Sequence, residues 1–304
     1  MHRKLVPDWE FSVPSFGVAN ADDASMPFFS AVTKHKTYTF STKGALADLS
    51  LKTIESGVRG NWYDVFAASS ALTLTIRDQL PGAFNAGNVL ASVLVISNLL
   101  SVEVEEIIPL ITRLKPVRGR MNTIYRGQPF EVLVDYAHTP SSFETILPPL
   151  RERLNSTRPG GQGRLICLFG SAGERDTQKR KLQGEIAARY SDLIFLTDED
   201  PRGEEPMAIL EEIAQGCETA QGCEAGQGCE TFIRNENLFL IPNRPQAIRK
   251  AFSLARQGDL VLLLGKGHEN SIIYANETID YDEISEAEKA LEEAGYTAVP
   301  HLNS

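Results

Sequence analysis

The sequence lacks the features that would place it at a membrane, outside the cell or on nucleic acid. Its longest apolar run, Val89–Leu100, contains two serines and an asparagine and is too short to cross a bilayer. The first residues lack the apolar stretch of a secretory signal. The 30 Lys and Arg are outnumbered by 40 Asp and Glu, which argues against broad contact with nucleic-acid backbone. We therefore expect a cytoplasmic protein with neither membrane nor nucleic acid as partner.

Cysteine is also scarce, and its four copies do not form a disulfide framework. Cys167 lies in the apolar run Leu165–Phe169 and is predicted to be a buried thiol. The other three fall in a repeat, Gln-Gly-Cys-Glu, written three times between Gln215 and Glu230. This spacing lacks the close cysteine pairs of zinc sites, and no histidine is near. The pattern favours an expanded surface loop over a metal site.

Two nucleotide-binding signatures are missing as well. The sequence contains neither G-x-G-x-x-G nor a Walker phosphate loop. Their absence argues against a nicotinamide-dependent oxidoreductase and against a self-contained P-loop enzyme.

The C-terminal part alternates strand and helix signals, which predicts an α/β fold with a doubly wound, mainly parallel sheet. The expected strands are Glu131–Asp135, Leu165–Phe169, Leu193–Thr197, Leu238–Ile241 and Leu260–Leu264. The expected helices are Ser141–Leu154, Gln178–Tyr190, Pro206–Ala214, Arg244–Arg256 with Asn243 as cap, and Ile284–Ala294 with Asp282 as cap.

The first part of the chain has a different pattern, with few helix signals before residue 84. Short strands are expected at Phe16–Asn20, Thr37–Phe40, Leu49–Ile54, Val58–Tyr63 and Ala71–Ile76, and helices at Asn85–Leu100 and Glu103–Leu114. We expect two domains, 1–115 and 116–304, of which the first resembles the latter part of a domain.

Four of the expected strands run directly into polar segments: Asp135–Pro140, Gly170–Asp176, Thr197–Arg202 and Gly265–Glu269. Each segment alone is compatible with a helix cap, a turn or a solvated loop. Because the carboxyl ends of parallel strands share one rim, their coincidence favours a ligand site. The glycine turn and the helix after it suit an anion, and the carboxylates and arginine of Thr197–Arg202 suit an amino-acid zwitterion.

In order and spacing, these segments resemble the Mur ligases, in the branch of UDP-N-acetylmuramoyl-tripeptide synthetases. The family's GRM, DYAHTP, RD-x-x-KR, D-N-P-R and GKGHE motifs correspond to Gly119–Met121, Asp135–Pro140, Gly173–Lys181, Glu199–Arg202 and Gly265–Glu269. Upstream, Asn20–Asp23 and Phe84–Asn88 resemble family segments of the central, ATP-binding domain. The resemblance implies a Rossmann-like Mur ligase C-terminal domain preceded by a truncated α/β central ATPase domain.

The resemblance implies an ATP-dependent ligase of peptidoglycan precursor synthesis. ATP would phosphorylate the glutamate carboxylate of UDP-N-acetylmuramoyl-L-alanyl-D-glutamate, with Mg²⁺ neutralising phosphate charge, and the amine of a diamino acid would attack the acyl phosphate. The implied nucleotide-binding residues are Asn85, Asn88, Arg120, Asp135 and His138, with Asp135 on ribose hydroxyls. The implied amino-acid-binding residues are Arg175, Asp200, Arg202, Gly265 and Glu269.

The identity of the diamino acid stays open at this point. The D-N-P-R motif is changed to Glu199-Asp200-Pro201-Arg202. The added carboxylate favours lysine, whereas the retained Arg202 favours diaminopimelate, which has a second carboxylate.

Several parts of the family pattern are missing from the sequence. Residues 1–115 contain no G-T-x-G-K-[ST] loop. The family's carbamylated lysine would fall at or before Met1, and Lys4, the only candidate nearby, does not have the spacing that the family pattern requires. We therefore expect no catalytic residue and no Mg²⁺ ligand in this chain. The alternatives are a ligase fragment inactive alone, one half of a ligase whose phosphate loop comes from a second chain, and a non-catalytic module that binds an amino acid or nucleotide.

Overall fold

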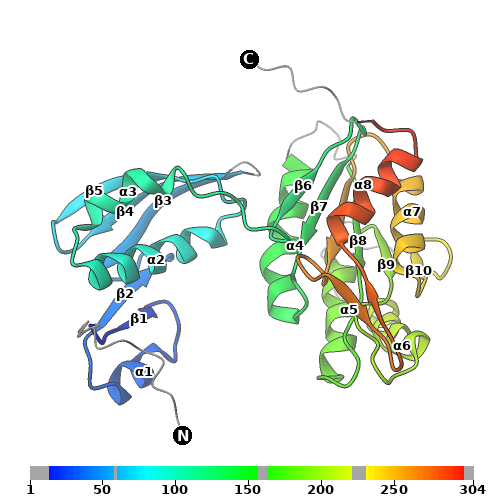
Figure 1. Cartoon of the computed structure of the whole chain (residues 1–304), viewed down its shortest axis with the longest axis horizontal. Coiled ribbons are helices and arrows are strands. Elements are labelled where there is room, and N and C mark those ends of the chain that lie inside the picture. The colour runs from blue at the N-terminus through cyan, green and yellow to red at the C-terminus, as the bar shows by residue number, and fades with distance from the viewer. Residues whose placement is uncertain (1–13, 58–59, 157–162, 221–230, 298–304) are drawn as a thin grey trace, which may run out of the picture. The chain divides into compact units, whose positions relative to one another are not determined.

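The structure is a computed structural model that describes residues 14–57, 60–156, 163–220 and 231–297. It divides into two compact units, Met1–Pro116 and Val117–Ser304, which are described separately (Figure 1). The first unit contains β1 (Gly17–Asn20), α1 (Met26–Val32), β2 (Thr37–Ser41), β3 (Leu49–Gly57), β4 (Gly60–Ala67), β5 (Leu72–Arg77), α2 (Phe84–Leu100) and α3 (Val104–Ile111). The second contains β6 (Asn122–Ile124), β7 (Glu131–Asp135), α4 (Pro140–Ser156), β8 (Leu165–Phe169), α5 (Gln178–Tyr190), β9 (Leu193–Leu196), α6 (Pro206–Thr219), β10 (Leu238–Leu240), α7 (Arg244–Leu254), β11 (Leu260–Leu264), β12 (Ser271–Ile273), β13 (Thr278–Asp280) and α8 (Glu283–Glu293).

The second unit is built on a six-stranded sheet of order β10-β9-β8-β11-β7-β6. The strands from β10 to β7 are parallel, and β6 joins β7 antiparallel. The central strands β8 and β11 are buried at every residue, as expected for strands covered on both faces. The predicted α/β class and the parallel arrangement are confirmed.

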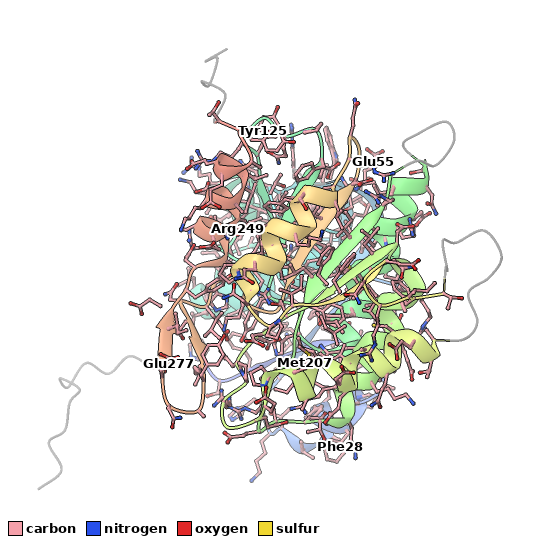
Figure 2. All side chains as sticks on the ribbon, turned by 90° about the vertical axis from the view of Figure 1, so that its right-hand side faces the viewer. Phe28, Glu55, Tyr125, Met207, Arg249 and Glu277 are labelled. Atoms are coloured by element: carbon pink, nitrogen blue, oxygen red, sulfur yellow. The ribbon has the colours of Figure 1, made fainter. Side chains whose placement is uncertain are left out.

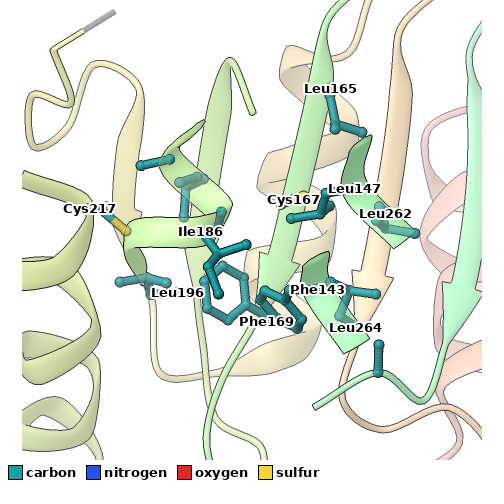
Figure 3. Close-up of a cluster of buried hydrophobic side chains, with 14 of the residues drawn as sticks. Phe143, Leu147, Leu165, Cys167, Phe169, Ile186, Leu196, Cys217, Leu262 and Leu264 are labelled. Carbon is teal, nitrogen blue, oxygen red and sulfur yellow. The ribbon is translucent and has the colours of Figure 1, made fainter. Parts of the chain in front are cut away.

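Helices cover both faces of this sheet (Figure 1). On one face α4, α5 and α6 pack against alternate strand residues, among them Leu165, Cys167, Phe169 and Leu262 (Figure 3). On the other, α7 and α8 pack against the intervening residues, such as Ile166 and Val261. The doubly wound architecture follows from this alternation, because successive side chains of a strand point to opposite faces.

Helix α6 corrects the prediction that the cysteine repeat is entirely a surface loop. The first copy forms the last turn of α6, which ends at Thr219 rather than Ala214. Cys217 is buried in the same cluster as Cys167 (Figure 3). A Cβ on Gly216 would stand 2.0 Å from the carbonyl oxygen of Lys181, so only glycine lets α6 approach α5 this closely. The second and third copies lie outside the described residues.

A buried ion pair joins the helices of the second unit to two strand ends. Arg244, at the start of α7, donates from Nε and Nη2 to the Glu283 carboxylate at 2.8 and 2.7 Å, and both side chains have no exposed surface. Its guanidinium also donates to the carbonyl oxygens of Asp198 (3.1 Å) and Leu264 (2.7 Å), which lie at the ends of β9 and β11. One side chain therefore fixes α7, α8 and two of the polar segments in place.

The first unit has a five-stranded sheet of order β1-β2-β3-β4-β5. The first three strands pair in parallel, and β4 and β5 extend the sheet antiparallel. Helices α2 and α3 cover one face through residues such as Leu90 and Ile107, which pack on Leu49 and Val65. In the short helix α1 no residue is buried, and Phe28 and Phe29 are exposed.

Most predicted elements are confirmed within a few residues, and both predicted caps are present, at Asn243 and Asp282. The strand predicted at Val58–Tyr63 is observed as β4, which runs over Gly60–Ala67 and so ends four residues later than predicted. Positions 58 and 59 lie outside the described residues. Helix α1, strand β6 and the β12–β13 hairpin were not predicted, since each is too short to show a hydrophobic period. In the part of the chain that the structure describes, no helix is both long and apolar enough to span a bilayer.

Replacing Arg244 by Met should strongly destabilise the second unit, because Glu283 would be left charged and buried without its partner. We expect its free energy of unfolding to fall by about 3–5 kcal/mol. The control is Arg249→Met on the same helix, whose ion pairs with Glu286 and Glu293 are partly exposed (Figure 2) and should contribute at most about 1 kcal/mol.

Urea denaturation can separate the two units, because both tryptophans, Trp9 and Trp62, lie in the first one. Tryptophan fluorescence therefore follows the first unit, and far-UV circular dichroism adds the second. An equal decrease in the free energy of unfolding for Arg244→Met and Arg249→Met would show that the buried pair is no more important for stability than the exposed pairs.

Candidate functional site

The polar segments predicted to share a rim follow strands that are neighbours in the sheet. The order β9-β8-β11-β7 places Thr197–Arg202, Gly170–Asp176, Gly265–Glu269 and Asp135–Pro140 side by side at the carboxyl ends of parallel strands. Ligands of open α/β sheets bind at this edge.

Tyr136 is the centre of a cluster of cationic and aromatic side chains. The Arg120 guanidinium carbon lies 4.8 Å from the centre of its ring, and the rings of His138 and His268 each lie 4.7 Å from it, centre to centre. The Tyr136 hydroxyl donates to Glu269 Oε1 at 3.0 Å. The cluster presents planar groups and positive charge together, which suits a base or phosphate of a nucleotide.

Asp135 is buried and holds the segment that contains Arg120. Its Oδ2 accepts the amide of Met121 at 2.8 Å, and its Oδ1 accepts the amide of Ala137 at 2.7 Å. Burial raises the pKa of the Asp135 carboxyl, and the two amides and Arg120 oppose this change. The bond to Met121 also stabilises a left-handed backbone at that residue, with φ of 49°. Each carboxylate oxygen therefore already accepts one backbone hydrogen bond.

His138 is oriented by the backbone around it. Its Nδ1 lies 2.8 Å from the carbonyl oxygen of Tyr136, which can only accept, so Nδ1 carries a proton in this contact. The His138 carbonyl oxygen in turn accepts from Lys179 Nζ and Gln183 Nε2, each at 3.0 Å. These bonds leave His138 Nε2 as the ring atom available to a ligand.

Lys266 is fully buried and bridges two of the predicted amino-acid-binding residues. Its ammonium donates to Asp200 Oδ1 at 2.9 Å and to Glu269 Oε2 at 2.7 Å. A buried ammonium is tolerated when carboxylates compensate it at close range. Lys266 therefore orients Asp200 and Glu269, and it neutralises part of the charge that the sequence places there.

Glu199 is a buried carboxylate beside this cluster. It is 6% exposed, and its Oε2 has no hydrogen-bond partner among the described residues. Burial raises the pKa of Glu199 to about 7, against the attraction of Lys179, Arg244 and Lys266. A Cβ on Gly265 would stand 2.8 Å from this oxygen, so the glycine leaves room for Glu199. An unsatisfied acceptor at a strand end suits a ligand that carries an ammonium group.

Arg202 lies at the end of the same segment. It is half-buried, and its Nε is buried without a partner among the described residues. Its backbone is left-handed, with φ of 54°, which is uncommon for a residue with a side chain. The remaining predicted amino-acid residue with a positive charge, Arg175, is exposed in the glycine-containing turn before α5. A guanidinium with an unsatisfied donor is suited to bind a carboxylate.

The two predicted nucleotide-binding asparagines lie in the first unit, in the first turns of α2. Asn85 Nδ2 donates to the carbonyl oxygen of Pro81 at 2.7 Å, and Asn88 Nδ2 donates to Asn85 Oδ1 at 2.9 Å. The structure therefore brings the asparagines together with each other. Their contact with a nucleotide stays a prediction.

The sequence prediction omitted Glu199, Tyr136 and Lys266 from its site residues. All three lie within the motifs. What identifies them is their contact with other side chains in the fold, which their residue types alone do not indicate. Lysine at position 266 in particular reads as a surface cation in the sequence and is 0% exposed in the fold.

The described residues show no fit to a resident metal ion. They contain no group of three or more His, Cys, Asp or Glu side chains arranged to hold one. Lys4, the weak candidate for a carbamylated lysine, lies outside the described residues. We therefore assign no Mg²⁺ ligand and derive no step through the metal.

The fold and the rim together define a class, namely an α/β ligand-binding domain with charged side chains at the carboxyl ends of a parallel sheet. Residues 119–267 match the family model described as Mur ligase, glutamate ligase domain. The chain belongs to the Mur ligase family.

Similar curated proteins carry names from one branch of this family. The UDP-N-acetylmuramyl-tripeptide synthetases of Treponema denticola and Roseiflexus are 46% and 43% identical, over 91% and 94% of this chain and 51% and 52% of theirs. A UDP-N-acetylmuramoyl-L-alanyl-D-glutamate--2,6-diaminopimelate ligase of Bacillus velezensis is 34% identical over 92% of this chain and 52% of its own. The chain therefore spans about half the length of the curated relatives it matches.

Solved structures of Mur ligases share the fold. The UDP-N-acetylmuramate-alanine ligase of Thermotoga maritima superposes with a TM-score of 0.60 at 15% identity, over 91% of this chain and 51% of that one. A MurF ligase of the same organism in complex with ADP gives a TM-score of 0.56 at 19% identity, over 93% and 55%. At these identities the likeness concerns the fold alone.

Replacing Glu199 by Gln should change how stability depends on pH. In the folded protein the pKa is about 7 against an ordinary 4.5, so the folded state binds the proton more tightly than the unfolded state. The stabilisation of the folded state that comes from this tighter proton binding is complete below pH 4.5 and is lost as the pH rises through 7. We expect the free energy of unfolding of the variant to exceed that of the parent by about 3 kcal/mol at pH 8, and the two values to become nearly equal at pH 4.5.

Urea denaturation from pH 4.5 to 8 checks this expectation, with the exposed Glu277→Gln as matched control. The control should follow the parent at every pH. Parallel curves for parent and Glu199→Gln would show that Glu199 is not held in a desolvated site.

Proposed function

We propose that this chain provides the amino-acid site and part of the nucleotide site of a UDP-N-acetylmuramyl-tripeptide synthetase. The reaction would be the ATP-dependent addition of a diamino acid to UDP-N-acetylmuramoyl-L-alanyl-D-glutamate in peptidoglycan precursor synthesis. The observation that carries the proposal is a group of buried atoms in the segment after β9 that have no hydrogen-bond partner among the described residues: one carboxylate oxygen each of Asp198 and Glu199, and Nε of Arg202. The names and half-length matches of the curated relatives support it.

In this proposal the chemistry proceeds through an acyl phosphate. The glutamate carboxylate of the muramoyl dipeptide takes the terminal phosphoryl group of ATP, and ADP leaves. The amine of the diamino acid then attacks the acyl carbon, an amide bond forms, and inorganic phosphate leaves. Enzymes accelerate such steps chiefly by positioning and by stabilising charge.

The residues of the second unit would divide this work between two neighbouring subsites. Arg120 and His138, which pack on Tyr136, would contact the nucleotide. Asp135 would hold the segment that contains Arg120, and its contact with ribose stays a prediction. Arg202 and Arg175 would bind carboxylate, and Glu199 with the bridged pair Asp200 and Glu269 would bind ammonium. Gly265 would leave room for Glu199. For Asn85 and Asn88, which lie in the first unit, contact with a nucleotide stays a prediction.

The charges leave a diamino acid as the favoured substrate class. Lys266 already neutralises part of the charge of Asp200 and Glu269, and Asp198 accepts the hydroxyl of Tyr274. Glu199 keeps a buried oxygen without a hydrogen-bond partner among the described residues, and it suits the distal ammonium that lysine and diaminopimelate share. Arg202 would also bind the second carboxylate of diaminopimelate. Both lysine and diaminopimelate are therefore compatible with these charges.

Replacing Arg202 by Ala should weaken amino-acid binding, since a charge-assisted hydrogen bond would be lost. We expect a loss of roughly 2 kcal/mol or more. Isothermal titration calorimetry with lysine and with diaminopimelate measures it, and a larger loss for diaminopimelate would assign Arg202 to its second carboxylate. The control is Arg256→Ala, an exposed arginine before β11 at the other end of the strands. Unchanged affinity in Arg202→Ala would show that the arginine is only a loop residue.

Phosphate release tests whether catalysis needs a phosphate loop from elsewhere. The chain is incubated with the muramoyl dipeptide, the diamino acid and Mg-ATP, with or without the half of the Treponema denticola synthetase that this chain does not match. We expect release only in the mixture, because residues 1–115 contain no such loop, and we expect Arg202→Ala to reduce it. Amino-acid binding without release in any mixture would instead support a non-catalytic binding module.

A further inference from the structure

The β12–β13 hairpin is attached to the Asp198–Arg202 segment at three points. The Arg202 amide donates to the carbonyl oxygen of Ile273 at 2.9 Å, and the Ile273 amide donates to Asp200 Oδ1 at 2.9 Å. The Tyr274 hydroxyl donates to Asp198 Oδ2, also at 2.9 Å. A β-bridge between Arg202 and Tyr274 accompanies these bonds. The hairpin therefore contacts the amino-acid segment along its length.

These bonds explain how Arg202 keeps its backbone conformation. A left-handed φ of 54° costs free energy in a residue with a Cβ and persists only where the surroundings determine it. Here the amide of Arg202 is fixed by β12, and the bridge to Tyr274 extends that pairing. The direction in which the Arg202 side chain leaves the backbone thus depends on the hairpin.

The hairpin is also attached at its base, where the Tyr281 amide donates to the carbonyl oxygen of Asn270 at 3.0 Å and the Tyr281 hydroxyl donates to Glu283 Oε2 at 2.6 Å. Strand β13 is exposed at all three residues, and the turn between the strands, labelled at Glu277 in Figure 2, projects at the edge of the molecule. Ile272 is the buried residue of β12. The three polar bonds to the amino-acid segment therefore fix the end of β12, at Ile273 and Tyr274.

Among these bonds, the one from Tyr274 is the one made by a side chain of the hairpin. Its acceptor, Asp198, is 4% exposed, and the other oxygen of that carboxylate has no partner among the described residues. Hydrogen bonds to a charged acceptor are stronger than neutral ones. Removing the hydroxyl would take away one of the three bonds to the segment, the one made by a side chain of the hairpin, without creating a large cavity.

We propose that Tyr274 is a positioning residue that sets the specificity of the amino-acid site. Through its bond to Asp198 it helps to seat the hairpin. The hairpin in turn holds Asp200, which would contact the distal ammonium of the amino acid, and Arg202, which would contact the distal carboxylate of diaminopimelate. This inference rests on the proposed function, because it assumes that the segment binds an amino acid. It adds a residue outside the motifs that predicted the site.

The experiment compares Tyr274→Phe with the parent chain by calorimetric titration of lysine, diaminopimelate and norleucine. Norleucine has the α-amino acid group and a four-carbon side chain but no distal polar group. We expect the parent to prefer lysine or diaminopimelate over norleucine, and the variant to lose about tenfold of that preference, as for one hydrogen bond to a charged group. Its affinity for norleucine and its melting temperature should stay close to those of the parent.

Two further variants make the result specific. Tyr125→Phe, an exposed tyrosine of the same unit (65% exposed, Figure 2), should behave as the parent. Asp198→Asn alters the acceptor of the same bond and should lower the preference in the same direction, with little further loss when combined with Tyr274→Phe. Asp198→Asn also gives an independent measurement if Tyr274→Phe folds poorly.

The outcomes separate the inference from the proposed function. If the parent shows the preference and both Tyr274→Phe and Asp198→Asn retain it, Tyr274 does not position the site and only this inference is overturned. If the parent does not prefer either diamino acid over norleucine, the amino-acid site itself is wrong, and both proposals are overturned. Equal weakening for all three ligands would assign Tyr274 a general structural role and would also overturn the inference.

Discussion

The arrangement of the second unit depends on the buried Arg244–Glu283 pair. A guanidinium has five donors in one plane, and here they meet a carboxylate on α8 and carbonyl oxygens at the ends of β9 and β11. The desolvation of both charges is offset only because so many of these donors are satisfied. The same interaction therefore stabilises the core and fixes two of the segments that carry the candidate site.

Electrostatics divide the site between satisfied and unsatisfied charges. Asp200, Lys266 and Glu269 form a closed group, whereas Glu199 and Arg202 keep atoms without partners. The satisfied group provides rigidity, and the unsatisfied atoms are the ones that gain most from a ligand, since buried polar groups without hydrogen bonds are costly. Binding an amino acid would complete a network that the fold leaves open.

The sequence predicted the second unit well because its strands are continuous apolar runs between amphipathic helices. The strands β7, β8 and β11 were predicted with their observed bounds, as was α5. The hairpin was missed because three-residue strands such as Ser271–Ile273 have no measurable period, and so its contribution to Arg202 was missed too. The burial of Lys266 and of Cys217 depends on contacts between distant segments, which no local pattern encodes.

The close approach of α5 and α6 depends on the first copy of the Gln-Gly-Cys-Glu repeat. In the first copy, glycine and cysteine are required by packing: Gly216 lets the two backbones touch, and Cys217 fills a small apolar space at 2% exposure. A side chain at position 216 would force the two helix backbones apart, and a larger side chain at position 217 would not fit the space that the thiol fills. Substitution at either position should accordingly disturb the contact between α5 and α6.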